Sequence, residues 1–167
     1  WESIKAGKHG IAEITRFDLE GHKVTLAAEV KDFDFGDRRA AKRLDIADQY
    51  ALVAAREAVE DSGIVSGENV DPDRFGIYGG TGIVIGGIST MEHEVEKCVK
   101  KGNLARASAL LVPMMMPNAI AGNISMEFNA KGASFGIVSA CAAGTHNIGE
   151  AYRNIKHGYN DVVMAGG

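Results

Sequence analysis

Residues 134–153 change their hydrophobic periodicity in the middle, and this stretch constrains the fold more than any other. An apolar, partly β-branched segment ends at Cys141, and a pattern that repeats about every 3.6 residues begins just after it. We therefore predict a strand, a sharp turn and a helix, with Cys141 at or just before the N-terminus of the helix. One face of that helix is expected to pack on a sheet through Ile148, Ala151, Tyr152 and Ile155.

The predicted position of Cys141 suits nucleophilic chemistry. A thiolate attacks carbonyl carbon, and a helix N-terminus favours an anion because its first N–H groups are unpaired. The neighbouring residues are small, so an acyl group is expected to reach the sulfur past Ala140, and a backbone N–H at the turn is expected to stabilise an oxyanion. The local pattern is equally compatible with a small buried cysteine in a protein core.

Helices and short apolar segments alternate along the rest of the chain, which predicts an α/β fold with a largely parallel sheet. We expect strands at residues 23–30, 75–79 and 161–165, the last of them buried on both faces. The expected helices span residues 46–62, where Gly63 provides a stop signal, 91–101 and 118–128. A chain of 167 residues with 46% hydrophobic content is sufficient for one domain.

Two motifs that suggest a cofactor or a metal fail on their spacing. In the glycine-rich residues 79–87, Ile85 replaces the last glycine of a dinucleotide fingerprint and Ile88 replaces the lysine of a phosphate loop. We interpret these glycines as positions of close backbone approach or positive φ. Lys97 stands where a zinc motif beginning at His93 needs a second histidine. The sequence therefore predicts no cofactor and no metal.

The composition is that of an ordinary soluble protein, and we expect a cytoplasmic one. A net charge of −4 gives no electrostatic reason to expect nucleic acid or a membrane surface as partner. No apolar run approaches the length of a membrane span. The two cysteines are predicted to be free thiols, with Cys98 on the buried face of its helix.

Residues 138–151 and 161–167 resemble the active-site segment of the β-ketoacyl-acyl-carrier-protein synthases, and the elongating type II enzymes most closely. The resemblance extends over essentially all 167 residues. It implies a thiolase-like fold, of which residues 1–167 would be one N-terminal domain: a mixed, largely parallel sheet flanked by helices. It also implies that the first strand and the C-terminal half of the enzyme lie outside this sequence.

The resemblance implies an acyltransferase of fatty-acid elongation with Cys141 as its catalytic nucleophile. Cys141 would hold an acyl chain as a thioester, and a malonyl thioester on acyl carrier protein would lose CO2 and attack that acyl carbon. Acyl carrier protein would be the partner and the full-length enzyme a homodimer. The family's two active-site histidines and its lysine would lie beyond residue 167, so His146 is assigned helix packing or hydrogen bonding. We expect residues 1–167 alone to be inactive.

The resemblance also suggests residues that bind substrate. The family carries an isoleucine that lines the acyl pocket within the segment matching residues 79–87, and Ile83 and Ile85 are the candidates for that place. Leu111 lies where aromatic pocket residues often occur, and Ala140 adjoins the nucleophile. The charged residues 37–45 are either a solvated helix face or part of a basic rim that receives carrier protein.

Three alternatives remain open at this point. A polyketide ketosynthase would use the same cysteine chemistry on other substrates. An amidase-like hydrolase would need a histidine and a carboxylate that converge on Cys141. A ketosynthase-like subunit without catalytic activity would serve through dimerisation alone, although the presence of Cys141 argues against it.

Overall fold

The computed structural model describes residues 1–82 and 87–167. They form two compact units, residues 1–34 and residues 35–167.

The first unit is small and contains one two-stranded sheet. Helix α1 (Glu2–Lys5) precedes strand β1 (Ile11–Glu13), which pairs antiparallel with β2 (Leu26–Ala28). Beside the sheet, the Thr15 hydroxyl donates to the Glu29 carboxylate at 2.8 Å, and this hydrogen bond lowers the Glu29 pKa. The predicted strand at 23–30 is therefore confirmed over its central residues, whereas β1 is too short to have produced a periodic signal.

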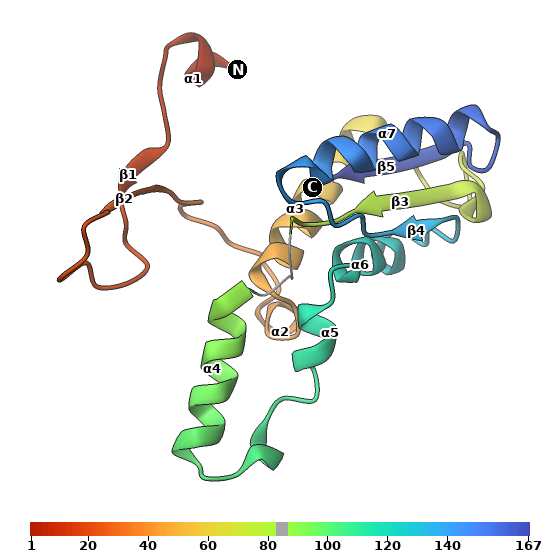
Figure 1. Cartoon of the computed structure of the whole chain (residues 1–167). Helices are drawn as coiled ribbons and strands as arrows, with labels where there is room; N and C mark the ends of the chain where they lie inside the picture. The colour runs from red at the N-terminus through yellow and green to blue at the C-terminus, as the bar shows by residue number, and fades with distance from the viewer. Residues whose placement is uncertain (83–86) are drawn as a thin grey trace. The chain divides into compact units, whose positions relative to one another are not determined.

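The second unit is built around a three-stranded parallel sheet with the order β4-β3-β5 (Figure 1). Its strands are β3 (Phe75–Gly79), β4 (Ser134–Phe135) and β5 (Val162–Gly166). Its helices are α2 (Arg38–Ala41), α3 (Ile46–Ser62), α4 (Gly87–Lys100), α5 (Leu111–Met115), α6 (Ala119–Glu127) and α7 (Ala143–Lys156).

Helix α3 has the predicted bounds because both of its ends carry clear signals. The Asp45 side chain caps the first turn by accepting the Ala47 N–H at 2.9 Å. Gly63 ends the helix in the left-handed conformation, with φ of +67°, where its N–H bonds back to Val59 and Glu60. Arg56 then ties this helix to α6 through a bidentate ion pair with Glu127.

Strand β3 is the centre of the core. All five of its residues are buried, and Phe75 and Ile77 are each only 1% exposed. Helix α7 packs on β5 and β3, while α6 packs on β3 and β4 and also contacts α3 (Figure 1). At the start of the strand, Arg74 donates to Asp161 at 2.6 Å and so connects β3 to the segment that enters β5.

The strand that leads to Cys141 is shorter than predicted. Strand β4 ends at Phe135, and residues 136–139 are not part of a strand. The reason is that β4 pairs with β3 alone, with Phe135 opposite Tyr78, and β3 itself ends one residue later at Gly79. Strand β5 also differs from the prediction, because its residues are half-buried and not fully buried.

The predicted contact face of α7 is confirmed only at Ala151, which is buried. Ile148, Tyr152 and Ile155 are 58%, 62% and 43% exposed, and the other buried residues of the helix are Ala143 and Asn147. Small residues allow a closer approach: a Cβ added at Gly144 would lie 2.9 Å from the carbonyl oxygen of Gly167. The helix therefore rests on the sheet by its small residues and leaves its large apolar ones outward.

Among the described residues, no helix combines the length and the apolar character that crossing a membrane requires. Cys98 is buried on α4, as predicted, and both cysteines are free thiols.

Candidate active site

Cys141 lies in a tight turn directly before α7. The turn is a 3-10 helix, η3 (Ala140–Ala142), and α7 begins at the next residue. Cys141 is exposed, in contrast to buried Cys98. The predicted position at the N-terminus of the helix is therefore confirmed, and the interpretation of Cys141 as a buried core residue is wrong.

The backbone of this turn is strained. Ala140 has φ of +50°, a left-handed conformation that costs a residue with a Cβ about 1–2 kcal/mol. Backbone hydrogen bonds hold the turn: the Ala140 N–H donates to the Gly82 carbonyl at 3.2 Å, the Ala142 N–H to the Ser139 carbonyl at 3.1 Å, and the Ala143 N–H to the Ala140 carbonyl. The thiol is thus presented on a sharp corner, as at the nucleophile elbow of hydrolases.

The N-terminus of α7 has no side-chain cap. Its cap residue, Ala142, makes no side-chain cap hydrogen bond, although the N–H of the first helical residue, Ala143, donates to the Ala140 carbonyl within η3. The first N–H groups of a helix have no carbonyl partner within the helix, and the helix dipole adds a partial positive charge there. This end of α7 therefore suits both a thiolate and a developing oxyanion beside it.

Glycines let a second loop pack behind the cysteine turn. A Cβ added at Gly82 would lie 3.1 Å from the Cα of Ala140, and one added at Gly80 would lie 2.6 Å from the carbonyl oxygen of Ile137. Neither glycine has positive φ. The prediction of close backbone approach in this glycine-rich segment is therefore confirmed at these two positions.

We expect Gly80→Ala to destabilise the protein by about 1–3 kcal/mol, because the new Cβ would meet the Ile137 backbone and not a movable side chain. Urea unfolding of the full-length protein measures this. The matched control is Gly149→Ala on α7, where an added Cβ meets nothing within 4 Å and alanine favours the helix by about 1 kcal/mol. Equal stability of the two variants would contradict the packing described here.

Two polar side chains at the start of α7 make contacts that the sequence did not predict in detail. The Nδ1 atom of His146 lies 2.7 Å from the Ser139 hydroxyl oxygen, which agrees with the hydrogen-bonding role assigned to His146. Asn147 is 0% exposed, and its side-chain amide donates to the Gly166 carbonyl at 2.9 Å. In residues 1–82 and 87–167, no hydrogen bond or ion pair joins a carboxylate to His146, so the convergence that a hydrolase needs is not seen.

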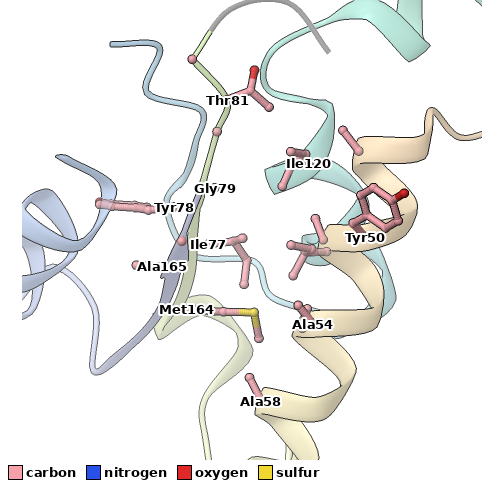
Figure 2. Close-up of a pocket in the computed structure, with 18 residues that line it drawn as sticks. Tyr50, Ala54, Ala58, Ile77, Tyr78, Gly79, Thr81, Ile120, Met164 and Ala165 are labelled. Atoms are coloured by element: carbon pink, nitrogen blue, oxygen red, sulfur yellow. The ribbon is translucent and has the colours of Figure 1, made fainter. Parts of the chain in front are cut away.

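A cavity of about 560 Å³ lies between α3 and the sheet (Figure 2). One wall is formed by alanines of α3: Ala47, Ala51, Ala54, Ala55 and Ala58. Ile77 and Met164 point from the sheet toward this wall, while Tyr78 points to the other side of its strand. Burial raises the Tyr78 pKa. Cys141, Ala140 and Leu111 do not line this cavity, although Gly79–Gly82 at its end adjoin the cysteine turn.

A second cleft, of about 470 Å³, carries positive charge. It is formed by α2 and the residues around it together with parts of α5 and α6; its lining is Asp37, Arg39, Ala40, Arg43, Leu44, Leu110, Pro113 and Asn123. Asp37 caps α2 by accepting the N–H groups of Arg39 and Ala40, and these hydrogen bonds lower its pKa. The arginines at positions 39 and 43 are exposed.

A buried carboxyl group lies close to this cleft. Asp48 on α3 is 1% exposed, and neither of its oxygens has a hydrogen-bond partner of good geometry. Burial raises the Asp48 pKa to about 6, assisted by the charge of Asp45 and opposed by the nearby Asn123 amide. The sequence pattern gave no signal for this residue, because a single aspartate in the first turn of a helix is usually exposed.

The predicted substrate-binding residues fall in three places. Ile83 and Ile85 lie outside the described residues. Ala140 is exposed in the same turn as Cys141, whereas Leu111 is half-buried at the start of α5. In the part of the chain that the structure describes, no group of three or more His, Cys, Asp or Glu side chains could hold a metal ion.

Comparisons with known proteins agree on one family. The chain is 42% identical over 170 aligned residues to "3-oxoacyl-[acyl-carrier-protein] synthase 2" of Staphylococcus aureus, a match that covers all of this chain and 41% of the relative. The chain thus spans about two fifths of the length of that relative.

Solved structures show the same fold. "The ishigamide ketosynthase/chain length factor" superposes with a TM-score of 0.85 at 27% identity, over 99% of this chain and 41% of that one. A type II polyketide ketosynthase in complex with its acyl-carrier protein, AntDE:AntF, gives 0.72 at 25% identity, over 81% of this chain and 39% of that one.

The family model described as "Beta-ketoacyl synthase, N-terminal domain" matches residues 1–167. With the strand, cysteine turn and helix in place, and with ketosynthases as structural neighbours, the chain belongs to the β-ketoacyl synthase family and has its thiolase-like α/β fold.

Proposed function

We propose that this chain is part of a 3-oxoacyl-acyl-carrier-protein synthase that elongates fatty acids, with Cys141 as the nucleophile. One observation carries the proposal: in a chain of this family, an exposed thiol stands on a strained turn at the uncapped N-terminus of α7. An exposed cysteine at such a corner has no packing role, whereas nucleophilic attack needs both access and a nearby positive potential.

The proposed reaction has two halves. The Cys141 thiolate attacks the carbonyl carbon of an acyl thioester; a new C–S bond forms, and the carrier thiolate leaves with the electron pair of the bond that breaks. A malonyl thioester then loses CO2, and the electron pair of the broken C–C bond attacks the acyl carbon and expels the Cys141 thiolate. Covalent capture divides one difficult step into two easier ones.

The described residues supply the nucleophile and a place for negative charge. A tetrahedral intermediate on Cys141 would place its oxyanion in the positive field of the α7 N-terminus, which has no side-chain cap; the Ala143 N–H itself donates to the Ala140 carbonyl. Activation of the malonyl group needs further groups, which we assign to parts of the enzyme beyond this chain, since the chain spans about two fifths of its relative. We accordingly propose that residues 1–167 alone do not complete the condensation.

We propose acyl carrier protein as the partner, and the arginine-lined cleft beside α2 as part of its docking surface. Arg39 and Arg43 are exposed at that cleft, where they would meet an acidic protein or the phosphate of its prosthetic arm. The structural neighbour AntDE:AntF is a ketosynthase in complex with an acyl-carrier protein.

Charge reversal tests this surface. We expect Arg43→Glu to raise the KM for acyl-carrier-protein substrate about 10-fold at low salt with kcat nearly unchanged, because the cleft would repel an acidic partner. Lys131→Glu makes the same change of charge at an exposed position away from the cleft and should leave KM unchanged. An equal rise of KM in both variants would show that only net charge matters.

We also propose that the full-length enzyme is a cytoplasmic homodimer. Helix α4 leaves Val95 53% and Val99 73% exposed, and an apolar helix face of this kind is typical of a surface that a second subunit covers. Light scattering of the full-length protein at micromolar concentration checks the dimer, and a monomer mass would reject it.

A polyketide ketosynthase is the second candidate, and the structural neighbour AntDE:AntF, from a type II polyketide system, favours it. The higher identity, 42%, to the Staphylococcus aureus synthase favours fatty-acid elongation. Both candidates use the same chemistry at Cys141, so the fate of the product separates them. A fatty-acid synthase performs one condensation for each reduction cycle, whereas a polyketide ketosynthase condenses an unreduced chain repeatedly.

The deciding experiment supplies the full-length protein with an acyl-carrier-protein thioester and malonyl-acyl-carrier protein. We expect 3-oxoacyl-acyl-carrier protein and CO2 in equal amounts. Free fatty acid without CO2 would indicate a hydrolase, and the absence of both products would support a subunit without catalytic activity.

A further inference from the structure

Ser139 and His146 stand on either side of Cys141 and contact each other. Ser139 is the last residue before the η3 turn, and His146 is the fourth residue of α7. The His146 Nδ1 atom and the Ser139 hydroxyl oxygen are 2.7 Å apart, a short hydrogen bond. This hydrogen bond links the two ends of residues 139–146, the segment that contains the η3 turn and the first residues of α7.

The turn inside that segment needs support. Ala140 has φ of +50°, which alanine adopts unfavourably; its N–H donates to the Gly82 carbonyl, and its own carbonyl accepts the Ala143 N–H. Ser139, which precedes the turn, makes two contacts across it. Its carbonyl accepts the Ala142 N–H at 3.1 Å, and its side chain contacts His146. The side-chain contact thus adds to the backbone hydrogen bonds that oppose relaxation of Ala140 toward negative φ.

His146 is well placed to provide the support because its own backbone is fixed. The next residue, Asn147, is completely buried and donates its amide to the Gly166 carbonyl at the end of β5. The imidazole is therefore carried on a rigid helix anchored to the sheet, and its contact with Ser139 connects the cysteine turn to that anchor.

We infer that Ser139 and His146 form a clamp that holds the cysteine turn in its strained, thiol-presenting conformation, and that both are positioning residues for Cys141. Neither residue takes part in bond making. The conformational part of this inference stands on the hydrogen bonds above, and its kinetic consequence rests on the proposed function.

Hydrogen exchange in the full-length protein tests the clamp without any assay of activity. Ser139→Ala and His146→Ala should each speed exchange of the Ala140 and Ala142 amides about 5-fold, the usual effect of one hydrogen bond, and leave β3 unchanged. The double variant should exchange no faster than either single variant, because both remove the same contact. Unchanged exchange in the single variants, or multiplied effects in the double one, would overturn the clamp.

Conservative and suppressor variants sharpen the test. Ser139→Thr keeps the hydroxyl and should exchange as the wild type does. Glycine adopts positive φ at little cost, so in the Ala140→Gly protein the further change Ser139→Ala should speed exchange by less than about 2-fold. A full 5-fold effect with glycine at position 140 would show that the clamp does not act on backbone strain.

Acyl transfer then separates this inference from the proposed function. If Cys141 is the nucleophile, Ser139→Ala and His146→Ala should lower the rate of acyl transfer about 5-fold with KM unchanged. Altered exchange in an enzyme that transfers no acyl group at all would retain the clamp and reject the proposed function. Unchanged hydrogen exchange in variants of an enzyme that does transfer acyl groups would reject the clamp and retain the proposed function.

Discussion

Replacement of Cys141 by alanine should lower the rate of condensation by about 10⁴-fold or more, because no other group described here replaces a covalent nucleophile. The measurement is formation of 3-oxoacyl-acyl-carrier protein by the full-length variant in the presence of both thioester substrates. The fold should survive, since Cys141 is exposed.

Cys98 provides the matched control for this prediction. Cys98→Ala removes the other thiol, which is 5% exposed on α4, and should cost about 1 kcal/mol of stability while leaving condensation within about 2-fold of the wild type. Activity retained in Cys141→Ala, or lost equally in both variants, would remove Cys141 from the role of nucleophile.

The second large effect concerns stability. Asp48→Asn should raise the free energy of unfolding by up to about 3 kcal/mol at pH 8 and by less than about 1 kcal/mol at pH 4. Asp48 has a pKa of about 6 in the folded protein, mainly because it is buried, whereas the ordinary value for Asp is 3.8. The folded state therefore binds this proton more tightly, so wild-type stability falls as pH rises from about 4 to about 6.

An asparagine at position 48 carries no titratable proton, so the stability of the variant does not fall with pH at this site. Urea unfolding at the two pH values measures the difference. Asp61→Asn, at the exposed end of the same helix, should change stability by less than about 0.5 kcal/mol at either pH. An equal gain from Asp48→Asn at both pH values would show that Asp48 is not protonated on burial.

Features with local signals were predicted correctly. Helix α3 has the predicted bounds because an aspartate cap and a left-handed glycine mark its ends within the sequence itself. The position of Cys141 was predicted because the change of hydrophobic period depends only on neighbouring residues.

Features that depend on packing partners were missed. The length of β4 is limited by the end of β3, some 55 residues earlier in the chain, and no local pattern reports that. On α7, Ala151 was predicted correctly, but the large apolar residues of the predicted face were wrong because the sheet selects small residues there. The Ser139–His146 contact spans a turn in which Ala140 has positive φ, and a run of small residues does not reveal that turn.

The most direct test of the central claim is the mass of the Cys141 peptide. The full-length protein is incubated with an acyl-acyl-carrier protein in the absence of malonyl substrate, digested, and analysed by mass spectrometry. We predict that the peptide containing Cys141 gains the mass of the acyl group, that the Cys98 peptide does not, and that malonyl-acyl-carrier protein then removes the label. An acyl mass on another residue, or on none, would contradict the account.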